Sequence, residues 1–403
     1  MNKKTFLIAA GCIYLLSISL SLFQGVFIKD EAEYHYPLVQ KFSEEFPKFD
    51  LENNYSSAST PLPYIILATL GKIIGLNVYS LRLVTLLVSI GTLYYFYKIL
   101  TIFNVKNIYQ VVLLLLIHPY FIQNSVTLYT PVWGMFFGMT SLYYFLNNKK
   151  KYAYLVSGIL AALAVLSRQY YLFLPASYIS YLFLRNIKYR EKNLLYALLC
   201  ISIPQLIYLP VFLVWGGLVH PDFYKHEIGL KADNLVFFFV VIGFYYGWAV
   251  GKSITVINKK LIYIFVIAFI LFLLFTPEWY KHHGYSFITG IIMHISAIID
   301  KISGFLSEIF LLFLYFTGIA LVYRKIIERD FSNEKEFIIY FGLIFYIIIM
   351  IFNVRSGERF YLAGIPFIIL TFKNFISYRI NNIIISPYFC LSISYVYYWF
   401  YFS

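Results

Sequence analysis

Long apolar runs separated by short polar gaps dominate this sequence. A run of about 20 apolar residues crosses the roughly 30 Å hydrocarbon layer of a bilayer as one α-helix. The first run, Thr5–Phe27, follows two lysines and no small-residue cleavage site comes after it, so we expect a retained helix with a cytoplasmic N-terminus. The pattern predicts an all-α polytopic membrane protein of about thirteen transmembrane helices. The other crossings are expected near residues 79–101, 108–125, 131–147, 152–169, 170–184, 193–215, 234–250, 261–276, 305–323, 337–353, 361–377 and 383–401.

The stretch after the first run is the most acidic part of the chain. Residues 28–60 hold seven of the 19 acidic residues, which is typical of an extracytoplasmic loop. Ser59-Thr60-Pro61-Leu62-Pro63 then predicts a helix start, with a hydroxyl cap and prolines in the first turn. This helix is short and carries Lys72, so we expect it to lie at the membrane interface. We therefore predict a first extracytoplasmic loop over residues 28–78 with juxtamembrane helices, within a single transmembrane domain over 1–403 and with no separate soluble domain.

The composition excludes an ordinary soluble protein. Apolar residues make up 61% and charged residues 13% of the chain, with a mean hydropathy of +0.74, whereas soluble proteins carry about 25% charged residues. A formal charge of +13 would suggest nucleic acid in a soluble protein. Here the basic residues lie in the gaps that the positive-inside rule assigns to the cytoplasm, so we expect membrane lipids and no nucleic acid as partners. The expected inner loops are 149–151, 185–192, 252–260 and 324–325, and the outer ones are 28–60, 216–233, 277–304 and 354–360.

Two polar stretches at the expected outer side are candidates for chemistry. In Lys29–His35, a carboxylate at the membrane boundary could act as a general base, although spacing alone favours a solvated helix flank. In Arg355–Tyr361, Arg355 and Arg359 are four residues apart, and their planar guanidinium groups match a phosphate. The alternatives there are a snorkelling pair or an ion pair with Glu358. Because two outward arginines oppose the positive-inside bias, we favour phosphate binding for them.

A third candidate is Arg168, which lies between two short apolar runs with no polar loop to separate them. Such an arginine must face protein, water or a lipid head group, and a structural ion pair fits it as well as a substrate contact. The adjacent His282 and His283 cannot both point at one metal from a regular helix. No nucleotide-binding fingerprint occurs either. We therefore expect no metal and no cofactor.

Taken together, these stretches resemble motifs of the GT-C glycosyltransferases, membrane enzymes that use polyprenyl- or dolichyl-phosphate-linked sugars. Asp30-Glu31 after the first helix is similar to the acidic pair in the first outer loop of that superfamily. Thr60–Tyr64 with Leu81-Arg82-Leu83 resembles its proline-rich region. Gly357–Tyr361 with Pro366 resembles the late outer turn of its dolichyl-phosphate-mannose-dependent mannosyltransferases.

A narrower likeness is to the dolichyl-phosphate-glucose α-1,2-glucosyltransferase family. Lys29–Gln40 resembles the first loop of that family, and Arg168-Gln169-Tyr170-Tyr171 resembles a motif that follows a short helix there. The chain departs from the family at Leu128-Tyr129-Thr130-Pro131, which holds no acid in the second outer loop. A scheme without a metal therefore fits this chain best.

The resemblance implies inverting transfer of a hexose from a lipid-phosphate donor to a glycan or lipid-linked acceptor on the extracytoplasmic side. Asp30 is then our first choice for the base, with Glu31 second. The resemblance implies that four basic side chains bind the donor phosphate and that five other residues line the substrate pocket. The first set is Arg359, Arg355, Arg168 and Lys72, and the second is Glu33, His35, Tyr64, Glu358 and Tyr361.

Two other classes of membrane protein handle similar ligands. A transporter or flippase for a lipid-linked sugar would also need an arginine at the phosphate, but paired repeats with broken helices are typical of transporters, and we find none. A polysaccharide polymerase or ligase tends to have a large outer loop late in the chain, whereas here the largest polar loop is the first. The absence of a retrieval signal favours a bacterial cytoplasmic membrane over the endoplasmic reticulum.

Overall fold

In the computed structural model, all secondary structure of the described residues is helical. The first half contains α1 Lys3–Gln24, η1 Glu31–His35, α2 Tyr36–Glu45, α3 Leu62–Ile74, α4 Val78–Ile102, α5 Ile108–Leu116, α6 Pro119–Ser125, α7 Pro131–Leu146, α8 Tyr152–Ser167, η2 Gln169–Leu172 and α9 Phe173–Tyr189. The second half contains α10 Leu194–Ser202, η3 Ile203–Tyr208, α11 Leu209–Trp215, η4 Pro221–Phe223, α12 Ala232–Tyr246, η5 Gly247–Ala249, α13 Lys259–Leu274, α15 Ile291–Asp300, α16 Gly304–Ile327, α17 Lys335–Ile351, η8 Glu358–Gly364, α18 Ile365–Arg379 and α19 Asn382–Phe402. The structure describes residues 2–24, 27–28, 30–53, 55, 57–147, 152–189, 193–223, 230–249, 259–276, 290–327, 334–352, 358–380 and 382–402.

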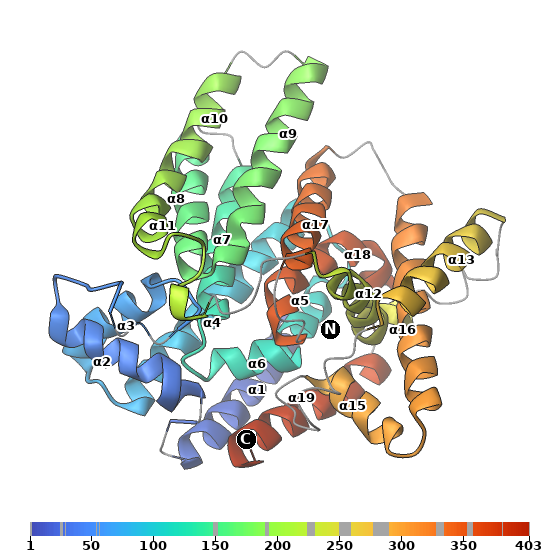
Figure 1. The fold of residues 1–403 in the computed structure, drawn as a ribbon, viewed down its shortest axis with the longest axis horizontal. Coiled ribbons are helices and arrows are strands. Elements are labelled where there is room, and N and C mark those ends of the chain that lie inside the picture. Colours follow the sequence, from blue (N-terminus) through green and yellow to red (C-terminus); the bar gives the residue numbers. More distant parts are fainter. Residues whose placement is uncertain are drawn as a thin grey trace.

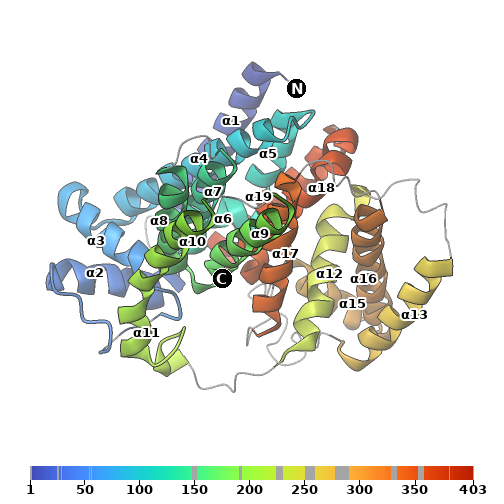
Figure 2. The same cartoon turned by 90° about the horizontal axis from the view of Figure 1, so that it is seen from above.

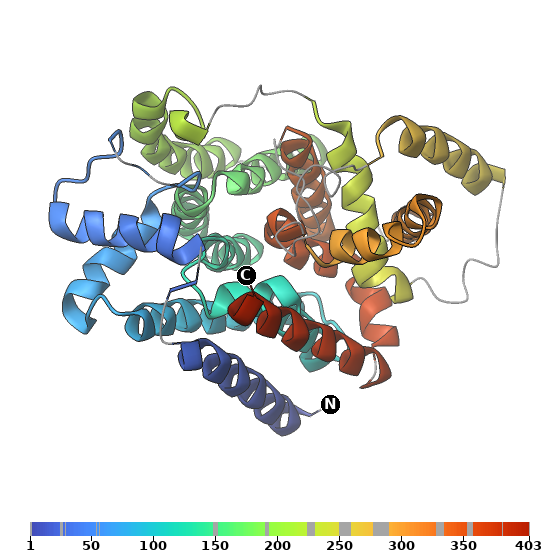
Figure 3. The same cartoon turned by 60° about the horizontal axis from the view of Figure 1, so that its bottom comes forward.

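Two groups of packed helices make up most of the molecule. In the first, α7 packs against α4 and α8, and α8 also packs against α10. In the second, α12 packs along α16 (both labelled in Figure 1), and the two lie next to each other in Figure 2. Helix α9 lies against α17 and so joins the two groups. The two terminal helices, α1 and α19, lie next to each other across one side of the molecule (Figure 3).

Small residues allow the closest of these contacts. A Cβ atom on Gly243 of α12 would lie 1.9 Å from the carbonyl oxygen of Leu314, and one on Gly318 of α16 would lie 2.0 Å from that of Phe239. Neither position can therefore hold a side chain without moving a backbone. Close approach of two helix backbones at glycine is a common way for membrane helices to pack, because the apolar lipid offers no hydrophobic driving force between them.

Four helical segments of the described residues are long and apolar enough to cross a membrane. They are Val78–Ile102, Leu194–Trp215, Ala232–Ala249 and Gly304–Ile327. Shorter apolar helices cover Leu62–Ile74, Tyr152–Ser167, Ile291–Asp300 and Tyr361–Ser377. The described chain is thus all-helical with several candidate membrane spans, and the expected number of about thirteen crossings stays a prediction.

Two expected segments differ in detail from the structure. The run expected as one crossing over 108–125 is two helices, α5 and α6, because Pro119 cannot continue a helix and His118 before it is extended. The segment 277–304, expected as an outer loop, contains the helix α15, while residues 277–289 lie outside the described residues. Residues 28–78 contain η1 and the helices α2 and α3. Helix α3 is followed by Gly75, whose φ of 96° favours glycine.

Candidate active site

The two consecutive acids of the first loop have different surroundings. Glu31 begins η1, a π-helical turn, and is completely buried. Its carboxylate forms a bidentate ion pair with Arg82 of α4, in which the Nε–Oε1 distance is 3.2 Å. The backbone N–H groups of Ile28 and Leu128 donate to the same carboxylate at 3.0 and 2.8 Å. Since a buried charge is tolerated only when it is paired and hydrogen-bonded, Glu31 has the geometry of an anchor that ties the first loop to α4.

Asp30, in contrast, is only partly buried. The hydroxyl of Tyr129 donates to its Oδ2 at 2.7 Å, which orients the carboxylate. Glu33 is exposed on the same turn. Of the three acids in this turn, Asp30 is the one that combines access to solvent with an oriented carboxylate.

A buried cluster of rings surrounds Tyr129, the residue that donates to Asp30. His35 Nδ1 is 2.7 Å from the hydroxyl of Tyr64, and that hydroxyl is 2.8 Å from Ser57 Oγ. The His35 ring also meets the ring of Tyr129 edge-on, with 4.9 Å between the centroids. Two residues expected in the pocket, His35 and Tyr64, therefore lie together beside the tyrosine that orients Asp30.

Arg168 reaches back from the end of α8 to the first loop. It stands in extended backbone between α8 and η2, and its Nη1 donates to Ser59 Oγ at 2.8 Å. The hydroxyl of Thr130 donates to the same Ser59 oxygen at 3.1 Å. The buried Nε of Arg168 has no hydrogen-bond partner among the described residues, and such groups are rare enough to mark a water or ligand site.

The expected hydroxyl cap of the short first-loop helix is wrong. Helix α3 begins at Leu62 with Pro61 before it and with no side-chain cap. The hydroxyl of Thr60 instead donates to the carbonyl oxygen of Val165 at 3.2 Å, and Ser59 serves Arg168. These contacts hold residues 57–60 against the end of α8. The two hydroxyls therefore bind α8 and Arg168 and do not cap α3.

Asp30 and Arg168 therefore flank one short segment of the chain. Tyr129 binds Asp30, and its neighbour Thr130 binds Ser59, which in turn accepts from Arg168. A carboxylate and a guanidinium group that are distant in sequence are thus held by two consecutive residues before α7, Asp30 by Tyr129 and Arg168 through Ser59 by Thr130.

The late turn packs on the same region of the molecule, since η8 contacts both α6 and α7. Its first residue, Glu358, is buried, and the hydroxyls of Tyr120 and Tyr245 donate to its Oε2 at 2.9 and 2.8 Å. The N–H groups of Ile292 and Met293, in the first turn of α15, donate to Oε1. Burial raises the pKa of Glu358 to about 7, and these four donors oppose that rise. Glu358 therefore links η8 to the N-terminus of α15.

The other expected site residues divide into three groups. Tyr361 is buried and donates to the carbonyl oxygen of Asn234 at 2.8 Å, so it packs inside the bundle. Lys72 is exposed, with its ammonium 4.9 Å from the centroid of the Phe46 ring, and no described contact joins it to Asp30 or Arg168. Arg355 and the side chain of Arg359 lie outside the described residues.

Sequence reasoning missed the partners that organise this site. Arg82 had one usable signal, because an arginine within an apolar helix must face a partner inside the protein. Tyr129, Ser59 and Thr130 gave no signal of their own. Among the described residues, no group of three or more His, Cys, Asp or Glu side chains could hold a metal ion.

Comparison with known proteins gives similarity only to solved structures. No known family matches the sequence, and no curated protein matches it either. ArnT from Cupriavidus metallidurans bound to undecaprenyl phosphate is 12% identical with a TM-score of 0.47, over 99% of this chain and 78% of that chain. The apo form of the same protein gives 12% identity and a TM-score of 0.46, over 98% and 77%.

A second similar structure is the archaeal oligosaccharyltransferase AglB from Archaeoglobus fulgidus, in complex with an inhibitory peptide and a dolichol-phosphate. It is 14% identical with a TM-score of 0.45, over 97% of this chain and 55% of that chain. These values are too low to assign a fold family or a function to this chain.

Proposed function

We propose that this protein is an integral-membrane glycosyltransferase that moves a hexose from a polyprenyl- or dolichyl-phosphate donor to a glycan or lipid-linked acceptor. The observation that carries the proposal is that consecutive residues before α7 hold Asp30 and Arg168, since Tyr129 donates to Asp30 and Thr130 shares the Ser59 oxygen with Arg168. Glycosyl transfer from a lipid phosphate needs both groups, because an acceptor hydroxyl must lose a proton where a phosphate gains charge. The reacting face is the extracytoplasmic one.

Asp30 is the proposed base of an inverting reaction. The acceptor oxygen attacks the anomeric carbon, and the bond from that carbon to the phosphate oxygen breaks on the opposite side. The acceptor proton passes to the Asp30 carboxylate, and the electron pair of the broken bond leaves with the lipid phosphate. Glu31 anchors the loop instead of acting as an alternative base, because its four bonds use both carboxylate oxygens.

Arg168 is the proposed partner of the phosphate. A phosphodiester that becomes a monoester gains negative charge, and a preorganised donor aimed at such charge contributes about 2.7–4 kcal/mol. The partnerless Nε of Arg168 supports this role. Arg355 and Arg359 remain predicted partners of the same phosphate.

Three further buried polar atoms, two of them in η2 directly after Arg168 and one in α7, support a ligand rich in hydroxyl groups. Trp133 Nε1, Gln169 Oε1 and Tyr171 Oη have no hydrogen-bond partner among the described residues. Trp133 belongs to the first turn of α7, and the other two belong to η2. Donors and acceptors together suit a sugar better than they suit a purely apolar ligand.

The test is donor consumption by the full chain in lipid, with a panel of polyprenyl-phosphate sugars. The wild-type protein should consume one donor and release polyprenyl phosphate. Asp30→Asn should lower the rate by about 10²–10⁴-fold, the usual contribution of a general base. The matched control Glu44→Gln, an exposed acid on α2, should stay within twofold.

Two results would overturn the proposal in different ways. A wild-type rate for Asp30→Asn would remove the base assignment. Movement of a lipid-linked sugar across vesicles without consumption of any donor would indicate a transporter.

Arg168→Ala offers a second test at the phosphate. Loss of its guanidinium should raise the KM for the donor and lower kcat, while the KM for the acceptor stays near the wild-type value. Lys106→Ala, which removes an exposed cation from the turn between α4 and α5, is the control. A larger effect on acceptor use than on donor use would contradict the assignment.

A further inference from the structure

Ser59, the serine that binds Arg168, is buried and has each of its polar groups bound within the protein. Its Oγ accepts from Arg168 and from Thr130, as described above. Its backbone N–H donates to Ser57 Oγ at 3.1 Å, and its carbonyl oxygen accepts from the Tyr55 hydroxyl at 2.5 Å. The position of the Ser59 hydroxyl therefore depends on the two residues that hold its backbone.

Tyr55 is held by the end of α11 and by the turn after it. Its ring centroid is 5.0 Å from that of Trp215 and 5.4 Å from that of His220, and all three side chains are buried. Trp215 Nε1 donates to the carbonyl oxygen of Leu51 at 2.8 Å. His220 Nε2 lies 3.0 Å from the carbonyl oxygen of Glu52, so this nitrogen carries the proton. These contacts hold both the ring of Tyr55 and the backbone just before it.

Arg168 benefits from a fixed partner because its side chain is long. An arginine loses much rotamer freedom when it is held in one position. A guanidinium group that is held before a ligand arrives does not lose that freedom on binding. The bond from Nη1 to Ser59 Oγ holds Arg168, and the buried Nε has no partner among the described residues. A shift of Ser59 should therefore move the group that faces the ligand.

We propose that Tyr55 is a positioning residue for the phosphate of the lipid-linked ligand. Its hydroxyl fixes the Ser59 carbonyl oxygen, and Ser59 Oγ in turn fixes Arg168. The inference rests on the proposed function, in which Arg168 binds the donor phosphate. It adds that α11 and the turn after it, which supply no reacting group, determine through Tyr55 how tightly that phosphate is bound.

The experiment is native mass spectrometry of the full chain in detergent, titrated with undecaprenyl phosphate or with undecaprenol, which lacks the phosphate. Tyr55→Phe removes the hydroxyl and keeps the ring between Trp215 and His220. It should weaken binding of undecaprenyl phosphate by about three- to tenfold, as the loss of a single hydrogen bond predicts. Binding of undecaprenol should not change, which also shows that the variant is folded. In the transfer assay, the KM for the donor should rise by the same factor while the KM for the acceptor stays constant.

A double variant separates positioning from general stability. In an Arg168→Ala background, Tyr55→Phe should have no further effect on binding of undecaprenyl phosphate, because its effect passes through Arg168. A purely structural loss would weaken binding in both backgrounds.

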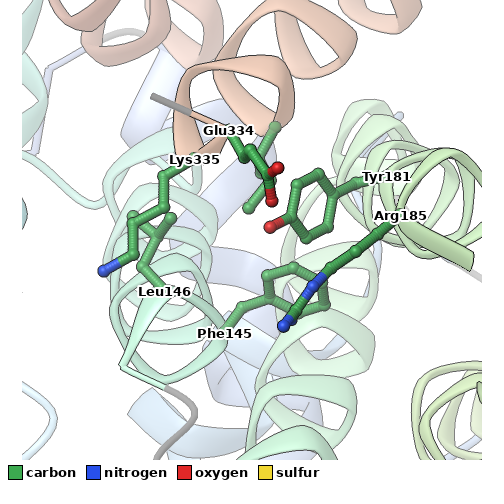
Figure 4. A pocket seen from close by; sticks show the side chains of 7 residues that line it. Phe145, Leu146, Tyr181, Arg185, Glu334 and Lys335 are labelled. Carbon is green, nitrogen blue, oxygen red and sulfur yellow. The ribbon is translucent and has the colours of Figure 1, made fainter. Parts of the chain in front are cut away.

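Two other tyrosines serve as controls. Tyr36→Phe removes a bond of the same kind from the first loop, since the Tyr36 hydroxyl donates to the carbonyl oxygen of Leu76 at 3.0 Å. Tyr181→Phe removes a hydroxyl that lies near the Glu334 carboxylate at a cavity of about 260 Å³ between α7, α9 and α17 (Figure 4). Both variants should bind undecaprenyl phosphate within twofold of the wild type.

The outcomes distinguish this inference from the proposed function. Equal effects of Tyr55→Phe and Tyr36→Phe, or an undiminished effect of Tyr55→Phe in the Arg168→Ala background, would overturn the inference even if the protein transfers a sugar. Binding that depends on Tyr55, in a protein that consumes no donor, would overturn the transfer reaction and leave the positioning role in place. A wild-type protein that binds the two lipids equally well would overturn both.

Discussion

The adjacent carboxylates of Asp30 and Glu31 differ in their burial and in the groups that bind them. Glu31 is fully buried against Arg82, while Asp30 keeps access to solvent with one tyrosine donor. The residue type and the position in sequence are nearly the same, so the difference comes from where α4 lies. In the proposed reaction, one acid thus holds the loop while the other accepts the proton.

Breaking the Glu31–Arg82 pair should destabilise the protein. Glu31→Gln keeps one acceptor oxygen, so one of the two backbone N–H groups loses its acceptor. It also leaves the buried Arg82 without its counter-charge, which typically costs about 3–5 kcal/mol. Arg82→Gln should cost a similar amount, and the double variant should cost less than the sum, since the two share one interaction. Thermal unfolding in detergent would measure this. A shift for Glu31→Gln as small as that for Glu44→Gln would contradict the anchor role.

The buried environment of Glu358 should make the stability of the protein depend on pH. It lies outside the four candidate spans, and burial raises its pKa to about 7 from an ordinary value of 4.5. Between these two values the folded protein holds a proton that the unfolded chain has released, so stability falls as the pH rises from about 4.5 to about 7 and is flat above.

This pH dependence should appear in the hydrogen exchange of the Ile292 and Met293 amides, which bind Glu358. Their protection factors, corrected for intrinsic exchange, should fall by at least about tenfold between pH 5 and pH 8, since one unit of pKa shift corresponds to 1.36 kcal/mol. Glu358→Gln should abolish the dependence. Protection that increases with pH would show that the four donors lower the pKa of Glu358 by more than burial raises it.

At the scale of elements, the sequence predicts what depends on local pattern. The acidic first loop with its short helices and the break after Ile74 followed from hydropathy, proline and glycine. The burial of Glu31 and the bond from Arg168 to Ser59 could not be predicted, because each depends on partners 51 and 109 residues away. Helix α15 was missed because its ten residues are too few to stand out as a crossing.

Helix contacts that depend on glycine give a sharp prediction at this scale. Gly318→Ala would place a Cβ atom 2.0 Å from the Phe239 carbonyl oxygen and force α12 and α16 apart, at a cost of about 1–3 kcal/mol. Gly11→Ala in α1 has open space around its Cβ and should stabilise the protein by up to about 1 kcal/mol. Thermal unfolding of the two variants should therefore shift in opposite directions. Equal shifts would mean that the close contact is absent.

At the scale of the whole molecule, α7 and α9 connect two ends of different character. One end carries Asp30, Arg168 and the first loop, and the other carries the end of α7 at Leu146 and the end of α9 at Tyr189. Basic residues are frequent in the sequence of the loops expected at the second end, which the positive-inside rule assigns to the cytoplasm. We therefore expect the two ends to lie at opposite faces of the membrane.

Labelling of single cysteines in intact cells tests this arrangement. In a background where Cys12, Cys200 and Cys390 are replaced by serine, Glu44→Cys on α2 should react with a membrane-impermeant maleimide from outside. Lys188→Cys on α9, where the lysine is 60% exposed, should react only after the membrane is permeabilised. The reason is that a charged reagent cannot cross the apolar layer that separates the two ends. Labelling of both positions from the same side would contradict the placement of the two ends at opposite faces. Exchange of the two patterns would instead invert the protein in the membrane and leave the geometry of the candidate active site as described.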